Sequence, residues 1–224
     1  MAQLRLAVLA SGRGSNFEAI LKSINSGKLK ATIQVVISNK ASAGALEIAR
    51  SHHIPAVHIS AKEFPQQEQF DEKLLAVVGE YQANFIVLAG YLKMLSPGII
   101  RAFKNRILNI HPALLPSFGG TGMYGHHVHQ AVLDYGCKVT GVTVHLVDEQ
   151  YDTGVPVLQR CVPVLDDDDA ESLAARVLKV EHQIFTEALQ LFADDRIEII
   201  GRRVKIKPEE HSFANRRRAV LGEH

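Results

Sequence analysis

The 224-residue sequence contains no tryptophan, only two cysteines and almost no excess of charge. Cys137 and Cys161 form no metal or redox spacing, and the N-terminal residues lack the basic stretch and long apolar run of a secretory signal. No apolar segment approaches the ~20 residues that a membrane-spanning helix requires. With a formal net charge of +1, the composition supports neither a nucleic-acid nor a membrane partner. These absences predict a reduced, soluble, cytoplasmic protein.

What the sequence does contain is an alternation of short apolar runs with amphipathic segments. The runs typical of buried strands are LRLAVLA (4–10), IQVVIS (33–38), AVHIS (56–60), FIVLAG (85–90) and ILNIH (107–111). Helical spacing or composition fills residues 15–26, 43–53, 66–82 and 97–104. Apolar strands separated by helices predict a parallel sheet with helices on both faces, and such sheets bind ligands at the carboxyl ends of their strands.

The pattern changes after residue 135. Residues 138–149 and 155–165 are typical of strands too close together for a crossover helix, so an antiparallel pair joined by the QYDTG loop is predicted. A long helix with an acidic start is predicted over 166–192, and a small hairpin over 197–206.

We therefore predict an α/β fold with a Rossmann-like, mostly parallel sheet and an antiparallel C-terminal portion. One domain is expected over residues 1–206. The charged segment 207–224 is expected to be a poorly ordered tail.

The first candidate site is the glycine-rich turn in LASGRGSNFEAI (9–20). Gly12 and Gly14 would let backbone N–H groups approach an anion such as a phosphate, and Ser15 or Asn16 is expected to cap the helix that follows. A dinucleotide-binding turn is an alternative, but a phenylalanine occupies the last glycine position of that motif. A plain capped turn also stays open.

The second candidate site is NIHPALLP together with QYDTG. Asn109 offers an N–H donor for an oxyanion, and His111 can hold or deliver a proton near neutral pH. Asp152 is the natural carboxylate to orient that imidazole and raise its pKa. Because neither Ser117 nor Cys137 has the surroundings of a nucleophile, direct transfer between two bound substrates fits better than a covalent intermediate. A structural role for the amide and the imidazole is the alternative.

Other polar clusters are given structural interpretations. His126, His127 and His129 have no Cys, Asp or Glu at ligand spacing, so a helix start with one histidine lining the site is preferred to a zinc site. His145 alternates with apolar residues on a strand and is expected to be structural. The acidic run 166–169 is expected to be a solvated helix N-terminus rather than a cation site.

Four motifs, GRGSN, LAGYLKMLSP, ILNIHPALLPSF and YDTGVPVLQRCVPV, occur in an order and at separations that resemble the phosphoribosylglycinamide formyltransferase family of purine synthesis. The resemblance covers roughly residues 4–206. It implies an enzyme that transfers the formyl group of 10-formyltetrahydrofolate, a co-substrate, to the amine of glycinamide ribonucleotide. The histidine and aspartate motifs are shared with the wider folate-dependent superfamily, whereas GRGSN points to the ribonucleotide enzyme within it.

The resemblance also implies roles for individual residues. Asn109 would stabilise the tetrahedral oxyanion, His111 would assist as an imidazolium, and Asp152 would orient that ring and help a water molecule to move protons. The backbone amides of Gly14, Ser15 and Asn16 would bind the substrate phosphate, and Glu181 its ribose. The folate-binding residues would be Leu92, Lys93, Met94, Leu95 and Glu149. No metal is implied.

The sequence departs from the family pattern at two places. Some members carry an arginine near the start of the third helix that reaches the phosphate, but this chain has Gln66 and Gln67 there. A different cation, or the turn alone, would then bind the phosphate. The glycine-rich loop over residues 117–129 is expected to act as a mobile lid.

Three alternative functions stay open: a formyltetrahydrofolate hydrolase, a formyltransferase with another amine acceptor such as aminoacyl-tRNA, and a non-catalytic folate- or nucleotide-binding module. The first usually has an N-terminal regulatory domain, and the second a C-terminal RNA-binding domain, and neither is expected around residues 4–206. The expected partners are the two small-molecule substrates, without nucleic acid or membrane, for a monomer or homodimer.

Overall fold

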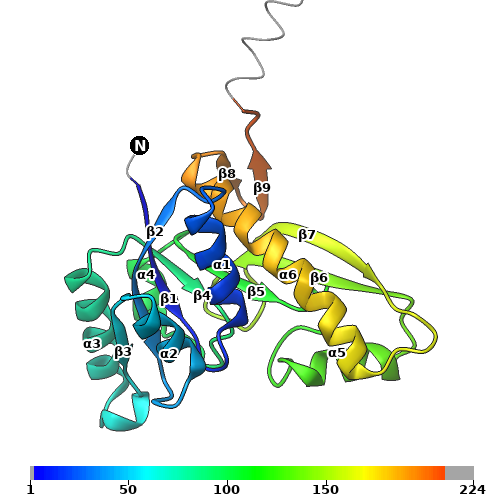
Figure 1. Ribbon diagram of the computed structural model, residues 1–224, viewed down its shortest axis with the longest axis horizontal. Helices are drawn as coiled ribbons and strands as arrows, with labels where there is room; N and C mark the ends of the chain where they lie inside the picture. The colour runs from blue at the N-terminus through cyan, green and yellow to red at the C-terminus, as the bar shows by residue number, and fades with distance from the viewer. Residues whose placement is uncertain (1–2, 210–224) are drawn as a thin grey trace, which may run out of the picture.

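The computed structural model describes residues 3–209, so the predicted tail lies, from residue 210 on, outside the described residues. A seven-stranded sheet in the order β3-β2-β1-β4-β5-β6-β7 occupies the centre (Figure 1). Its strands are β1 (Leu4–Leu9), β2 (Ala31–Ser38), β3 (Ala56–His58), β4 (Phe85–Leu88), β5 (Ile107–His111), β6 (Val139–Leu146) and β7 (Pro156–Pro163). Strands β1 to β5 pair in parallel, whereas β6 runs antiparallel to both β5 and β7. The predicted Rossmann-like sheet with an antiparallel C-terminal portion is confirmed.

Helices cover both faces of this sheet (Figure 1). They are α1 (Ser15–Asn25), α2 (Gly44–Ser51), α3 (Gln67–Glu80), α4 (Pro97–Ala102), α5 (His126–Asp134) and α6 (Ala170–Ala193), with a 3-10 turn η1 (Ala61–Glu63). Strand β1 shows why two layers form, because Leu6 and Val8 pack into one core and Ala7 and Leu9 into the other. The first core also contains α1, α2, α5 and α6 residues, and the second contains α3 and α4 residues.

The two helix starts that border the predicted sites differ from the sequence prediction. Neither Ser15 nor Asn16 caps α1, because the cap position is Gly14. Gly14 has a left-handed φ of 89°, and a Cβ added there would lie 2.9 Å from Ala45. Helix α6 begins at Ala170, after the acidic run. The last acidic residue of that run, at position 169, forms a capping box with Ser172, which satisfies the first backbone N–H groups of the helix.

A small hairpin follows α6, as predicted, and consists of β8 (Ile197–Ile200) and β9 (Arg203–Ile206). Its turn residue Arg202 donates a 2.8 Å hydrogen bond from Nη2 to the backbone oxygen of Thr153. The hairpin is thereby tied to the loop between β6 and β7. None of the helices between residues 3 and 209 is long and apolar enough to cross a membrane.

Candidate active site

A cleft of about 980 Å³ opens at the carboxyl ends of β1, β4 and β5. Its walls come from the turn after β1, the segment after β4, the loop that leads into α5, the loop between β6 and β7, and one side of α6. This is the edge where a doubly covered parallel sheet binds its ligands. The order of the strands therefore brings segments far apart in the sequence into a single site.

Most of the predicted site residues line this cleft: Ser15, Asn16, Leu92, Lys93, Met94, Leu95, Asn109, His111, Asp152 and Glu181. Gly14 and Glu149 are not among its lining residues. The backbone of Gly14 lies close against Ala45 of α2, and the carboxylate of Glu149 faces Arg101 at 3.5 Å. The two neighbours of Glu149 in the chain, Asp148 and Gln150, do line the cleft.

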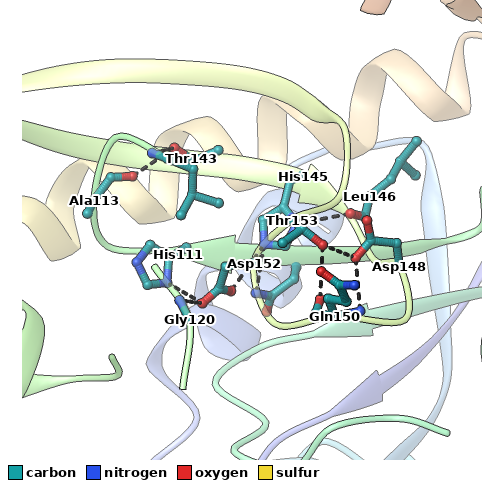
Figure 2. A network of polar contacts seen from close by, with 12 residues as sticks. His111, Ala113, Gly120, Thr143, His145, Leu146, Asp148, Gln150, Asp152 and Thr153 are labelled. Atoms are coloured by element: carbon teal, nitrogen blue, oxygen red, sulfur yellow. Dashed lines mark hydrogen bonds and ion pairs between the residues drawn. The ribbon is translucent and has the colours of Figure 1, made fainter. Parts of the chain in front are cut away.

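Asn109 and His111 lie two residues apart on β5, so their side chains point to the same face of the sheet. The loop between β6 and β7 brings Asp152 to this face, where its Oδ2 lies 3.6 Å from Nδ1 of His111 (Figure 2). The backbone N–H of Gly120 donates to the same Oδ2 at 2.9 Å. The other ring nitrogen of His111, Nε2, donates to the carbonyl oxygen of Phe118 at 2.8 Å, so Nδ1 is the nitrogen that faces the carboxylate.

Burial and the polar neighbours shift the pKa values of His111 and Asp152 in opposite directions. Burial lowers the pKa of His111, while Asp152 and the Phe118 carbonyl favour its charged form. Burial alone would raise the pKa of Asp152, but its polar contacts, the Gly120 N–H and the His111 ring among them, bring it below its ordinary value. Asp152 is therefore ionised at neutral pH, and the proton on His111 depends on that carboxylate.

His145, which the sequence pattern assigned to structure alone, lies inside this cluster (Figure 2). Its Nε2 is 3.0 Å from Nδ2 of Asn109 and 3.6 Å from Oδ1 of Asp152. Its Nδ1 is 2.9 Å from the carbonyl oxygen of Leu146. The alternation of apolar and polar residues on the strand could not distinguish this placement from that of an ordinary core histidine.

The glycine of the YDTG motif allows the loop to return to the sheet. A Cβ at Gly154 would lie 1.6 Å from the carbonyl oxygen of Leu146 and 3.3 Å from Nδ1 of His145. No other residue fits between these groups without displacing the backbone. The close approach keeps Asp152, two residues earlier, beside β5.

The start of α1 meets the middle of α6 at a buried pair. Nδ2 of Asn16 donates a 2.7 Å hydrogen bond to Oε2 of Glu181, which is 9% exposed. Burial raises the pKa of Glu181, and the Asn16 bond opposes that rise. The Oδ1 atom of Asn16 is buried without a hydrogen-bond partner among the described residues.

A signal for the burial of Glu181 was present in the sequence. The residue continues the apolar stripe of α6 that includes Val177 and Ile184, at spacings of four and three. Glutamates on helices usually face solvent, but this spacing places Glu181 on the buried side of α6.

The segment after β4 forms a wall with exposed apolar side chains. Leu92 and Met94 are 45% and 49% exposed, while Leu95 is buried. The backbone N–H of Leu92 donates to Oγ of Ser11 at 3.0 Å, which ties this segment to the end of β1. Burial raises the pKa of the neighbouring Tyr91 to about 12, so its phenol stays neutral.

The first turn of α5 contributes two of the three clustered histidines to the cleft, His126 and His129, rather than the one that the sequence predicted. His127 instead packs edge-to-face against Tyr124, with ring centroids 5.3 Å apart. Burial, together with nearby histidines, lowers the pKa of His129 to about 4, so this ring is neutral. Within residues 3–209, no group of three or more His, Cys, Asp or Glu side chains is arranged to hold a metal ion.

The start of α3, where the family arginine was expected, does not line the cleft. Gln67 donates instead to Oδ1 of Asp71 at 2.8 Å. Arg13 does line the cleft, within the turn between Gly12 and Gly14 that precedes α1. Its exposed guanidinium makes no hydrogen bond or ion pair with another residue of the described part of the chain. Sequence reasoning did not single out this residue.

Comparisons with known proteins place this fold in a family. Residues 4–189 match the sequence model of a family described as "Formyl transferase", and because the match covers most of the chain, the protein belongs to the formyl transferase family. The resemblance predicted from the four motifs is thereby confirmed at the level of the family.

Two similar proteins within the family carry the same name. The chain is 37% identical over 196 residues to phosphoribosylglycinamide formyltransferase of Escherichia coli (strain K12), covering 88% of this chain and 90% of that protein. It is 44% identical over 194 residues to a chloroplastic protein of the same name from Vigna unguiculata, covering 86% of this chain but 62% of that protein. The chain thus spans less than two thirds of the length of this plant relative.

A solved structure extends the similarity to the whole fold. Glycinamide ribonucleotide transformylase 1 from Symbiobacterium toebii superposes with a TM-score of 0.87 at 41% identity, covering 92% of this chain and 95% of that one.

Proposed function

We propose that the protein transfers the formyl group of 10-formyltetrahydrofolate to the amine of glycinamide ribonucleotide, a step of purine synthesis. The observation that carries the proposal is the meeting of Asn109, His111 and Asp152 in the cleft, between the turn after β1 and the segment after β4. An acyl transfer without a nucleophilic side chain needs an oxyanion donor and a proton carrier, and this cluster contains both. The names of the similar proteins support the same reaction.

The ribonucleotide is assigned to the side of the cleft formed by α1 and α6. Its phosphate binds the free backbone N–H groups of Gly14, Ser15 and Asn16 at the helix N-terminus, where the dipole favours an anion. Its ribose hydroxyls donate to the Glu181 carboxylate, which retains an oxygen that Asn16 does not use. Arg13, within the turn, supplies the cation that the start of α3 lacks.

The folate is assigned to the opposite side, between the segment 91–95 and the loop 147–152. Exposed Leu92 and Met94 present apolar surface, and the backbone between them presents hydrogen-bonding groups, a combination that suits a flat heterocycle. Of the predicted folate-binding residues, Lys93 and Leu95 lie on the same wall. Glu149 is assigned to the outer edge of the loop, where it can act only from beside Arg101.

The transfer proceeds by direct attack. The amine nitrogen of the ribonucleotide bonds to the formyl carbon, and the carbonyl electron pair moves onto the oxygen. Asn109 donates to this oxyanion, and His111, protonated beside Asp152, stabilises it further. When the oxyanion collapses, the bond from the formyl carbon to N10 of the folate breaks. The amine loses one proton and N10 gains one, with Asp152 and a water molecule carrying it, so tetrahydrofolate and formylated ribonucleotide leave.

A single assay tests the proposal: formyl transfer from 10-formyltetrahydrofolate with the ribonucleotide present or absent. We expect turnover that requires the ribonucleotide and falls about 10²–10³-fold in Asn109→Ala, the usual effect of removing an oxyanion donor. Asn25→Ala, an exposed change at the end of α1, is the matched control and should keep wild-type turnover. Formate release without the acceptor would identify a hydrolase, and no turnover at all would leave a binding module.

Further predictions from the sequence accompany this proposal. The partners are the two small-molecule substrates, and no metal is required for the chemistry described. A cytoplasmic location and a monomeric or homodimeric state are proposed together with them, as is a lid motion of the loop over residues 117–129.

A further inference from the structure

We propose that His145 is a positioning residue for the transfer, whose imidazole accepts at Nε2, sets the orientation of the Asn109 amide and directs one N–H of that amide into the cleft. The inference rests on the proposed function, because that N–H matters only where an oxyanion forms. Three observations carry it: the register of two strands, the partners of the two ring nitrogens, and the chemistry of the amide.

The register of the sheet places the two side chains together. In the antiparallel pair β5–β6, Asn109 is the direct partner of His145. Directly opposed residues have Cβ atoms about 4.5–5.5 Å apart on the same face. His145 is 2% exposed, so its ring has no room to turn toward solvent. The contact is therefore set by the backbone rather than by a flexible loop.

The partners of the ring define its tautomer. Nδ1 lies 2.9 Å from the carbonyl oxygen of Leu146, and because a carbonyl only accepts, Nδ1 carries the hydrogen and donates. In a neutral ring Nε2 is then a bare acceptor. Its neighbour at 3.0 Å is Nδ2 of Asn109, which only donates. The two contacts are satisfied together by one tautomer and one amide orientation.

The opposite orientation of the amide is disfavoured by the same pair. Rotating the amide by 180° would bring its oxygen against the Nε2 lone pair, so two acceptors would face each other. Asp152 also faces Nε2, but at 3.6 Å it lies beyond hydrogen-bond length, so Asn109 is the group from which the ring accepts. An unconstrained amide would present oxygen as readily as nitrogen.

The Asn109 amide keeps one N–H free for the cleft. An amide nitrogen carries two, and the bond to His145 uses one of them. The second remains for the cleft, which Asn109 lines. Because a donor already oriented toward developing charge needs no reorganisation during the reaction, His145 contributes to turnover without touching substrate.

Two matched variants separate this role from a purely structural one. Asn can replace Nδ1 as the donor to Leu146 but does not reach Asn109, whereas Gln extends an acceptor to the position of Nε2. We expect His145→Asn to lower kcat about tenfold or more with both KM values nearly unchanged, and His145→Gln to stay within about fivefold of wild type. Equal losses in both variants, or losses confined to KM, would overturn the proposal.

A double-mutant cycle adds a second criterion. In an Asn109→Ala background, His145→Asn should change kcat less than twofold, because the amide that it orients is gone. In a Glu181→Gln background, at the far side of the cleft, it should keep its whole effect. An undiminished loss in the Asn109→Ala background would show that His145 acts independently of Asn109.

The wild-type protein provides a test that needs neither activity nor a foldable variant. The ¹⁵N shifts of the His145 ring report which nitrogen carries hydrogen, and we expect a protonated Nδ1 and a bare Nε2. A ring protonated at Nε2 overturns the inference even if the enzyme is active. Conversely, wild-type protein without ribonucleotide-dependent turnover contradicts the proposed function, while the ring shifts still decide the orientation of the amide.

Discussion

The side-chain amide of Asn16 donates a 2.7 Å hydrogen bond to the carboxylate of Glu181, joining the first turn of α1 to the middle of α6 across 165 positions of the sequence. In the proposed complex these two residues serve different parts of one nucleotide, the phosphate and the ribose. Their bond makes the two subsites a single unit, because the helix turn cannot shift without moving the carboxylate.

The first prediction concerns substrate binding by Glu181. Glu181→Gln keeps the size of the side chain and an acceptor for Asn16 but removes the charge that ribose hydroxyls would meet. Hydrogen bonds to charged groups contribute about 1.5–3 kcal/mol, so KM for the ribonucleotide should rise about 10- to 100-fold, with a smaller change in kcat. Steady-state kinetics with the folate saturating measures this. Glu187→Gln, on the exposed side of the same helix and paired with Arg160, is the control and should leave KM unchanged.

The second prediction concerns stability and its dependence on pH. Burial raises the pKa of Glu181 above its ordinary value of 4.5, so the folded protein binds this proton more tightly than the unfolded chain does. Stability from this group is therefore present at low pH and lost as pH rises through the folded pKa. Glu181→Gln should raise Tm at pH 8 by a few degrees, since about 1 kcal/mol corresponds to roughly 2–4 °C in a domain of this size. The difference should shrink toward pH 4; a variant less stable than wild type at pH 8 would contradict the argument.

The third prediction concerns the proton on His111. Asp152 favours the charged imidazole against the effect of burial, so Asp152→Asn should lower the pKa of His111 further. If the imidazolium is the active form, kcat falls as pH rises through that pKa. The falling limb of the profile of kcat against pH should then move to lower pH in the variant, with kcat at pH 7 reduced about 10²-fold or more. Asp166→Asn, at an exposed pair with Lys138, should reproduce the wild-type profile. If the falling limb of the kcat profile stays at the same pH in Asp152→Asn, a group other than His111 causes it.

The fourth prediction concerns Arg13. If its guanidinium supplies the cation for the phosphate, Arg13→Gln should raise KM for the ribonucleotide about tenfold and leave KM for the folate unchanged, in line with a charge-assisted hydrogen bond in a partly exposed site. Inorganic phosphate should also become a weaker competitive inhibitor. Arg50→Gln, an exposed change at the end of α2, serves as the control. If Arg13→Gln and wild type have equal KM values for the ribonucleotide, Arg13 does not bind the phosphate, and the backbone N–H groups of the turn bind it alone.

The limits of the sequence prediction are physical and differ from site to site. The strands and the pair Asn109 and His111 could be found because apolar periodicity and strand ends are local properties of the chain. The contact of His145 with Asn109 depends on the register between β5 and β6, which no local pattern specifies. The position of Asp152 depends on a loop that returns to the sheet because Gly154 has no side chain. The sequence therefore predicted Asn109, His111 and Asp152 as site residues but not the contact between Asn109 and His145.

The fifth prediction concerns the backbone of the turn after β1, where two glycines provide their own control. Gly14 has a φ of 89°, and a Cβ there would lie 2.9 Å from Ala45, whereas a Cβ at Gly12 would meet nothing within 4 Å. Gly14→Ala should therefore lower the free energy of unfolding by about 1–3 kcal/mol, from backbone strain and from the clash with α2. It should also raise KM for the ribonucleotide, because the N–H groups that meet the phosphate follow directly. Gly12→Ala should change neither quantity appreciably. Chemical denaturation and steady-state kinetics on the two variants measure these effects. If Gly14→Ala is as stable as Gly12→Ala and has the same KM, the turn tolerates a side chain at both positions, and the prediction is wrong.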